Sequence, residues 1–179
     1  MSDCNPDGLL ILPTDGEASG THLDVKIRSA QLGGDFSVMQ GVMEPHQLLP
    51  PHTHVHEDQC VYVINGELEF EVGGEGGQRF TAPADAWVIK PRGVQHCFWN
   101  KTDATVHYIE LSGRDGFEGF IDSTTADGSF RAAHASERDY SITFHNERIP
   151  KLMLQHRLTS IAGLDTPLEA IRKKLGMEG

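Results

Sequence analysis

Three histidines recur at alternate positions in one short stretch, at His52, His54 and His56. Alternate residues of an extended strand point to one face of a sheet, so these imidazoles can share a face. Neutral imidazole is a common ligand of first-row transition metals. Another histidine, His96, lies at the centre of the later stretch PRGVQHCFWN. The pattern predicts a metal site in which His52, His54 and His96 supply nitrogen ligands from strands.

Gln59 follows the histidine pair and is predicted to lie with it on one arm of a hairpin. Its amide oxygen would join the three imidazoles as a ligand. Three nitrogen ligands leave coordination positions for water or a substrate, which is typical of a catalytic metal site and not of a closed structural one. The expected cofactor is one divalent transition metal, and iron, manganese, nickel, copper and zinc all tolerate such ligands.

The segments around these residues have the pattern of short strands. The sequence ELEFEV alternates, with Leu68 and Phe70 expected inside, and Asn65-Gly66 before it is a strong hairpin signal. Leu9 to Leu12 are interpreted as a leader strand at a sheet edge. Many short strands separated by glycine and proline predict an all-β sandwich or barrel.

The character of the chain changes after residue 113. Residues 1–113 are predicted to form the β-barrel core with its leader strand, and residues 114–179 a helical extension packed on it. A short helix is expected within residues 146–158. Thr166-Pro167-Leu168-Glu169 has the pattern of a helix start, with a capping threonine and a proline in the first turn.

Strand alternation also indicates which side chains line the barrel. Three side chains are expected on the same face of their strand as a predicted ligand: Val61 and Val63 with Gln59, and Phe98 with His96. They form either core packing or the wall of a substrate pocket. His107 lies two residues before Ile109 and four before Leu111 on a late strand, so its side chain is expected on the same face as theirs. It is a candidate acid–base group or a hydrogen-bond donor near the metal at the barrel mouth, and a purely structural role is the alternative.

Composition excludes several classes of function. The chain has 179 residues, which suits a single domain, and a net charge of −11, which argues against a nucleic-acid partner. No apolar run has the length of a membrane span, and LLIL is too short for the core of a signal peptide, so a cytoplasmic protein without a membrane partner is expected. The three cysteines form no CxxC pair, which fits a reducing compartment.

The two histidine stretches together resemble the motifs of the cupin family, and the chain is most similar to its single-domain, quercetin dioxygenase-like branch. The first cupin motif ends in His-x-His, three or four residues, Glu, six residues and Gly, and here His52, His54, Gln59 and Gly66 hold these positions. The second motif contains Pro-x-Gly, two residues, His, three residues and Asn, and Pro91 to Asn100 fit it. The segments LSGRDGFEGF and DYSITFHNERIPKLMLQHRL resemble the same branch.

The resemblance implies a jelly-roll barrel that holds one divalent metal, with His52, His54 and His96 as histidine ligands. It also implies a homodimer. The leading hypothesis is therefore a metal-dependent enzyme, a quercetinase-type dioxygenase that joins O2 to a small flavonol-like or enol-like substrate. The alternatives are a non-redox isomerase or hydrolase, and a binding module without catalytic activity.

Gln59 is the most consequential departure from the family pattern, because the family has a metal-binding Glu there. Gln59 is thus expected to act at the catalytic site as a neutral ligand that cannot be a general base near pH 7. Glu57 and Asp58 are interpreted as surface acids, since either could replace that Glu only through a register shift. His56 is expected to be exposed. His46 and Asp85 stand where the two motifs have glycine.

Overall fold

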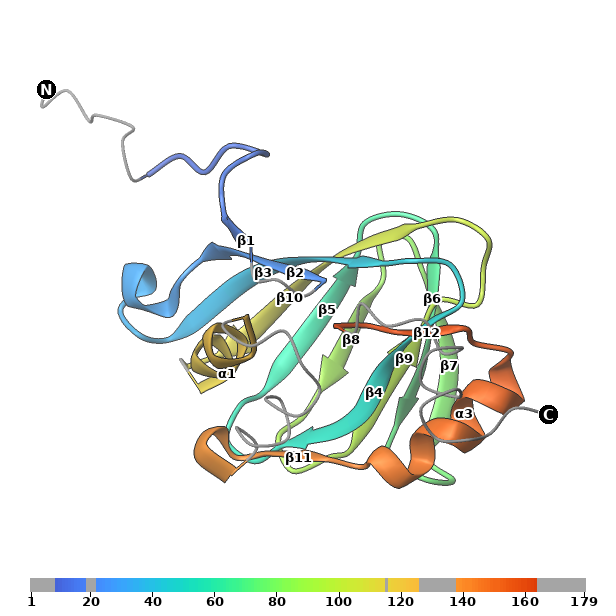
Figure 1. Cartoon of the computed structure of the whole chain (residues 1–179). Helices are drawn as coiled ribbons and strands as arrows, with labels where there is room; N and C mark the ends of the chain where they lie inside the picture. The colour runs from blue at the N-terminus through green and yellow to red at the C-terminus, as the bar shows by residue number, and fades with distance from the viewer. Residues whose placement is uncertain (1–8, 19–21, 115, 126–137, 164–179) are drawn as a thin grey trace, which may run out of the picture.

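The computed structural model describes residues 9–18, 22–114, 116–125 and 138–163, which form two β-sheets packed face to face with helices outside them (Figure 1). Sheet A has the spatial order β1 (Glu17–Ala18), β2 (Leu23–Ile27), β3 (Phe36–Met43), β10 (Val106–Gly113), β5 (Gln59–Val63) and β8 (Trp87–Lys90). Sheet B has the order β11 (Ile142–Phe144), β4 (Gln47–His54), β9 (His96–Trp99), β6 (Glu67–Val72) and β7 (Gln78–Pro83), and β12 (Ser160–Ile161) pairs with β4. The expected all-β jelly-roll class with a C-terminal helix is confirmed.

The Asn65-Gly66 turn does not form the predicted hairpin. The strand before it, β5, pairs with β10 and β8 in sheet A, whereas the strand after it, β6, pairs with β9 and β7 in sheet B. Gly66 has the positive φ of 70° that such a tight turn needs, and Asn65 bonds Thr105 O and His107 N. The turn therefore carries the chain from one sheet to the other, which lets both strands bury their apolar faces against each other.

The core lies between the two sheets. Inward side chains of sheet A, such as Met39, Val61 and Tyr108, meet Leu68 and Phe98 of sheet B, and all five are fully buried. A second apolar cluster lies on the outer face of sheet B, where α3 (Ile149–His156) covers it. The members of this cluster are Leu48, Cys97, Trp99, Ile149, Leu152, Met153, Leu158 and Ile161.

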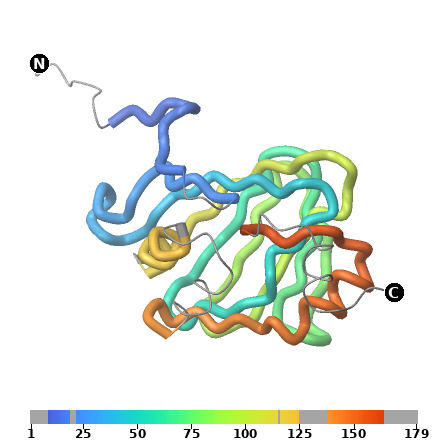
Figure 2. The backbone as a smooth tube through the Cα atoms, viewed as in Figure 1, coloured from blue at the N-terminus to red at the C-terminus, as the bar shows by residue number. Residues whose placement is uncertain are grey.

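The expected leader strand at Leu9 to Leu12 is not a strand. Leu9, Leu10 and Leu12 are 77%, 59% and 50% exposed, and Leu12 N donates to Asp15 Oδ2 in a turn. Figure 2 shows this segment extending away from the sheets. Pairing with β2 begins only at Glu17, because the turn at Pro13 and Asp15 redirects the chain first. A short apolar run was thus not sufficient to form a strand.

The C-terminal part contributes both helices and strands. α1 (Gly116–Thr125) and α3 are helical, and a 3₁₀ turn (Asn146–Arg148) precedes α3, as expected for residues 146–158. β11 and β12 both pair with β4, along the edge of β4 that β9 does not occupy. The predicted helix that begins at Thr166 lies outside the described residues. Among the described helices, none is long and apolar enough to cross a membrane.

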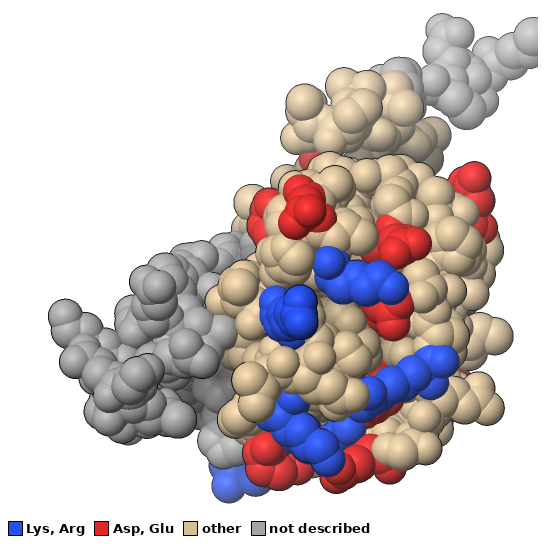
Figure 3. All heavy atoms as spheres, turned by 90° about the vertical axis from the view of Figure 1, so that its right-hand side faces the viewer, with Lys and Arg blue, Asp and Glu red and all other residues tan. Residues whose placement is uncertain are grey.

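Charges of both signs are interspersed on the face that carries β7 and α3 (Figure 3). Beneath that face, Glu71 is completely buried and pairs with both Arg79 and Arg148. Arg148 immediately precedes α3, so this cluster joins the helix to β6 and β7. The net negative charge of the chain does not produce a single-sign patch on this face.

Candidate metal centre

Neighbouring strands of sheet B place the three histidines together. β4 ends with His52 and His54, and β9 begins with His96, which lies opposite His52 in the antiparallel register. The three side chains are 1 to 6% exposed. His52 Nε2 and His96 Nε2 are 3.1 Å apart, and the ring centroids of His52 and His54 are 5.0 Å apart. Strand alternation therefore produces the predicted histidine cluster.

Backbone carbonyls fix which nitrogen of His52 and His96 faces the cluster. His52 Nδ1 lies 2.8 Å from Pro50 O, and His96 Nδ1 lies 3.0 Å from Val94 O. Because a carbonyl can only accept a hydrogen bond, each Nδ1 carries the proton and donates it. Each Nε2 then presents a lone pair toward the other. Two lone pairs 3.1 Å apart repel unless a cation lies between them.

His54 lies against a different group, the carboxylate of Glu57. His54 Nδ1 lies 3.5 Å from Glu57 Oε2 without a hydrogen bond, and both ring nitrogens of His54 are buried with no hydrogen-bond partner among the described residues. The interpretation of Glu57 as a surface acid is wrong, because Glu57 is only 4% exposed. The chain leaves β4 after His54 and turns Glu57 back under the site without any register shift. Asp58 is exposed as expected and pairs with Arg92.

Burial keeps the three imidazoles neutral. It lowers the pKa of His54 to about 3 and holds the pKa of His52 and of His96 well below the ordinary value, and the charge of Lys90 acts in the same direction. A neutral imidazole is the form that binds a metal ion. Burial raises the pKa of Glu57, where the adjacent backbone and nearby positive groups oppose the shift.

The geometry of the cluster fits a metal ion. The three histidines each offer one nitrogen, and these nitrogens all lie within 4.8 Å of one another. Two imidazole nitrogens that each lie about 2.1 Å from one metal and subtend roughly a right angle are about 3 Å apart. His52 and His96 present this spacing. His52, His54 and His96 could therefore hold a metal ion.

Gln59 lies on the opposite sheet from the histidines, not on the same hairpin arm as expected. It is the first residue of β5, and the loop of residues 55–58 crosses from β4 in sheet B to β5 in sheet A. Its Nε2 donates to Ser112 Oγ at 3.2 Å, and its Oε1 is buried with no partner among the residues described. A free, buried amide oxygen is compatible with the predicted ligand role, which stays a prediction.

Aromatic side chains cover the histidines. The ring of Phe117 in α1 meets His54 edge-on with centroids 5.0 Å apart, and Phe144 in β11 lies 5.9 Å from His52. Phe120 contacts both of these phenylalanines. The FEGF segment thus forms an apolar cap over the site, which keeps water away from it.

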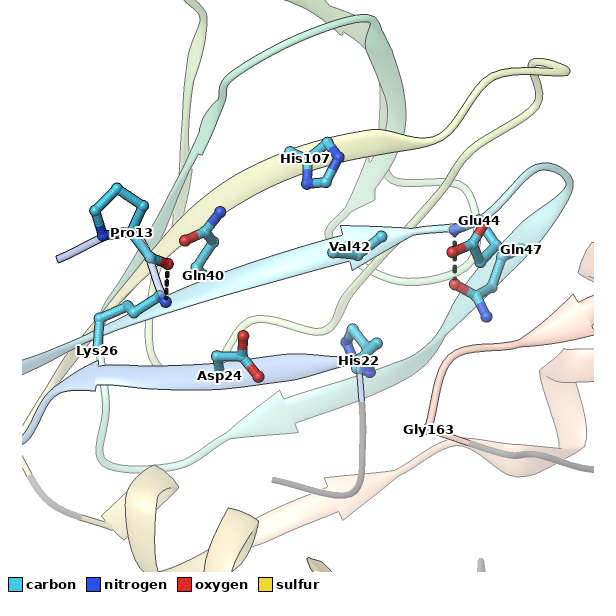
Figure 4. Close-up of a pocket in the computed structure, with 10 residues that line it drawn as sticks. All are labelled: Pro13, His22, Asp24, Lys26, Gln40, Val42, Glu44, Gln47, His107 and Gly163. Atoms are coloured by element: carbon cyan, nitrogen blue, oxygen red, sulfur yellow. Dashed lines mark hydrogen bonds between the residues drawn. The ribbon is translucent and has the colours of Figure 1, made fainter. Parts of the chain in front are cut away.

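His107 does not project into the barrel. On β10 the buried positions are Val106, Tyr108 and Glu110, and His107 lies on the other face, opposite Val42 of β3. It lines a groove of about 550 Å³ on the outer surface of sheet A, together with His22 and Gln40 (Figure 4). The prediction is wrong because Ile109 and Leu111 are apolar and yet both face outward, on the same side of β10 as His107. A catalytic role for His107 at the histidine cluster is not compatible with this position.

Val61, Val63 and Phe98 line the interior as predicted, and each is completely buried. Their role in a substrate pocket stays a prediction. Sequence reasoning missed a buried ion pair beside them, in which Lys90 Nζ lies 3.0 Å from Glu110 Oε1. The alternation of Trp87, Val88, Ile89 and Lys90 held the signal, because exposed Trp87 and Ile89 place Lys90 on the inner face.

Comparisons with known proteins found a family model and solved structures that are similar to parts of the chain. The sequence profile described as "Cupin domain" matches residues 39–112. No curated protein matches the sequence. Similar solved structures include the Cnp3 cupin domain of Schizosaccharomyces pombe, with 20% identity, a TM-score of 0.42, and coverage of 48% of this chain and 60% of that one.

Two further structures are similar to parts of the chain. One is an oxalate oxidase, with 21% identity, a TM-score of 0.48, and coverage of 64% of this chain and 63% of that one. The other is KdgF from Halomonas sp., with 17% identity, a TM-score of 0.45, and coverage of 52% and 79%. The chain thus spans less than two thirds of the oxalate oxidase and of the Cnp3 domain. The profile match includes Gln59 and all three histidines, and residues 39–112 are therefore similar to a cupin domain.

Proposed function

We propose that the protein is a metal-dependent cupin enzyme that acts on a small organic substrate. The observation that carries this proposal is the direction of the ring nitrogens: His52 Nδ1 and His96 Nδ1 donate to carbonyls, and both Nε2 lone pairs are left for a cation. A protein that used these histidines only for packing would gain nothing from two lone pairs in contact. When bound, a divalent transition metal supplies Lewis acidity and, if it is redox-active, a route for electrons to O2.

The residues around the histidines favour chemistry on a substrate that is shielded from water. Phe117, Phe120 and Phe144 form the cap, which excludes solvent from the imidazoles. Val61 and Phe98 provide an apolar surface inside the barrel. Only neutral side chains are proposed as ligands, so the positive charge of a bound metal would not be offset by a ligating carboxylate. Such a site favours a substrate that binds through an anionic oxygen.

We infer, more finely, a dioxygenase of the quercetinase type that uses O2 and a flavonol-like or enol-like substrate. The support is the motif resemblance together with the apolar cap. An oxygen electrode with quercetin as the substrate tests it on protein reconstituted in turn with Fe²⁺, Mn²⁺, Ni²⁺ and Cu²⁺. The expected result is metal-dependent O2 uptake that His96→Ala abolishes. Metal-bound protein that consumes no O2 with any of these metals would contradict the dioxygenase proposal.

Gln59 favours a second candidate, a non-redox isomerase or hydrolase. Its amide donates to Ser112 and cannot take up a proton, so this position offers no base to a dioxygenase substrate. A Lewis-acid reaction does not need O2. Turnover of a candidate substrate under strict anaerobic conditions, with no O2 uptake in air, would identify this class.

A further inference from the structure

A row of buried polar side chains crosses the inner face of sheet A. Lys90, Gln59 and Ser112 lie opposite one another on β8, β5 and β10, and Ser37 continues the row on β3. These four residues are at most 3% exposed. The next row is largely apolar and contains Val88, Val61 and Met39, with Glu110 as its polar member. Polar groups are thus concentrated at one level of an otherwise apolar barrel.

Lys90 reaches from sheet A toward the histidine-bearing sheet. Its Nζ lies 5.7 Å from the ring centroid of Phe98, which is in sheet B. Phe98 follows His96 by two residues on β9, so both side chains point into the same interior. The ammonium group is therefore on the inner wall that faces the candidate metal centre.

The ammonium group is not fully satisfied. Glu110 Oε1 lies 3.0 Å from Lys90 Nζ, yet the geometry is that of an ion pair without a well-formed hydrogen bond, and Nζ is buried. An ammonium has three N–H donors. Gln59 Oε1 is a second buried atom with no partner in the described structure. A donor and an acceptor on neighbouring strands of one wall thus make no well-formed hydrogen bond with any residue that the structure describes.

A buried ion pair is weak evidence for a stabilising role. Burying an ion pair costs desolvation energy that the mutual attraction rarely exceeds, and apolar replacements of similar size are often neutral or stabilising. The charges of Lys90 and Glu110 cancel, so the pair does not neutralise a metal ion held by three uncharged histidines. An anion between the metal and Lys90 would satisfy both the metal charge and the unused donors.

We propose that Lys90 binds the anionic oxygen, a carboxylate or an enolate, of the substrate at the metal centre and so selects acidic over neutral substrates. Glu110 is a positioning residue that holds the ammonium on the inner wall. This inference rests on the proposed function, because it names the substrate class of that same site. It assigns substrate selection to the polar row of sheet A and not to the apolar residues Val61 and Val63 alone.

Lys90→Met tests the proposal, because methionine keeps an unbranched side chain and removes the charge. The protein is loaded with Co²⁺, its metal content is measured, and acetate and then imidazole are titrated while the visible absorption is followed. Acetate is an anionic probe and imidazole a neutral one. Lys90→Met is expected to weaken acetate binding by about tenfold or more, because a bond to a charged group is lost. Imidazole affinity and the metal content should stay at wild-type values.

Lys101→Met is the matched control, because Lys101 is partly exposed and pairs with Glu67 and Glu69 on the surface. It should bind both probes like the wild type. Glu110→Gln is the second variant. Glutamine keeps an oxygen that can accept from Lys90 and hold the ammonium in place, and it should tighten acetate binding because it removes the negative charge that competes for Lys90. If Lys90→Met does not fold, acetate binding by Glu110→Gln tests whether Lys90 binds the anion.

Unchanged acetate binding by Lys90→Met, or an equal loss for acetate and imidazole, would overturn the inference and leave the proposed function intact. Unchanged or weaker acetate binding by Glu110→Gln would do the same. A wild-type chain that binds no Co²⁺ would instead refute the proposed function. Acetate would then be titrated calorimetrically into the metal-free wild type and Lys90→Met. A loss of acetate affinity of about tenfold or more in Lys90→Met would support anion binding by Lys90, and equal affinities would overturn it.

Discussion

Glu57 is a buried acid beside His54, although the cupin motif that the sequence resembles places the carboxylate two residues later. Its Oε2 lies 3.5 Å from His54 Nδ1, and its Oε1 lies where a side chain at Gly116 would begin. The carboxylate can therefore orient His54, as the Pro50 and Val94 carbonyls orient the other two imidazoles. Each proposed histidine ligand thus has an oxygen within 3.5 Å of its Nδ1, which is a hydrogen bond for His52 and His96 and a longer contact for His54.

Glu57→Gln should weaken metal binding about 10- to 100-fold, the usual effect of removing a group that orients a histidine ligand. Competition with a chromogenic chelator measures the affinity. Asp58→Asn is the matched control, because this neighbouring acid is exposed and pairs with Arg92. Equal affinities for the two variants would show that Glu57 does not orient His54.

His22 predicts a pH dependence of stability in the metal-free protein. Burial, with a smaller effect of the charge of Lys90, lowers its pKa to about 4. The unfolded chain binds a proton at His22 near pH 6.5, whereas the folded chain does not bind it until about pH 4. The contribution of His22 to the free energy of unfolding is therefore complete above pH 6.5 and is lost as the pH falls toward 4. The loss amounts to about 3 kcal/mol at most.

Urea unfolding at pH 7.5 and pH 4.5, with a chelator present, measures this loss for the wild type and for His22→Gln. The variant should lose less stability between the two pH values than the wild type. The comparison with His22→Gln is needed because the buried histidines of the candidate metal centre contribute to the same pH dependence of the free energy of unfolding. Equal losses would show that His22 is protonated in the folded protein.

At the scale of elements, β3 passes closely beneath the ring of Tyr108. A Cβ atom at Gly41 would lie 2.1 Å from Tyr108 Cζ, and the tyrosine is completely buried between the sheets. Gly41→Ala should therefore lower the free energy of unfolding by about 3 kcal/mol, because neither the strand nor the ring can move away cheaply.

Denaturant unfolding measures this change, and Gln40→Ala is the control. Gln40 is the neighbouring residue on the outer face of β3, where truncation should cost less than about 1 kcal/mol. Similar losses for both variants would mean that Tyr108 relaxes to accommodate the new methyl group.

Alternation within single strands was predictable, but the pairing of the strands was not. The pattern ELEFEV placed Leu68 and Phe70 inside correctly, since periodicity is a property of one strand. Asn65-Gly66 predicted a hairpin because local turn geometry permits one, yet β5 and β6 belong to different sheets. His107 was misplaced because both faces of β10 carry apolar residues, and only the sandwich decides which face is inside.

At the scale of the whole molecule, a bound metal would join both sheets to the cap. The histidines belong to sheet B, Gln59 to sheet A, and the covering aromatic side chains to α1 and β11. A ligand that binds only the folded state stabilises all of these parts together. Metal binding and global unfolding should therefore be coupled.

Saturating metal should raise the unfolding free energy by about 2.7 kcal/mol when its free concentration is 100 times Kd. Differential scanning calorimetry with and without a chelator measures the corresponding rise in Tm. His96→Ala should remove most of this difference. A wild-type Tm that does not respond to any of the divalent metals would contradict a metal centre.

The sequence by itself determined the all-β class, the cupin motifs and the three histidines, because residue spacing within a strand fixes which side chains share a face. Only the tertiary structure decided which groups surround them. It turned Glu57 back beneath His54, moved Gln59 to the opposite sheet and brought Lys90 and Glu110 inside. These positions depend on how two sheets pack across the barrel, and no local pattern in the chain encodes that packing.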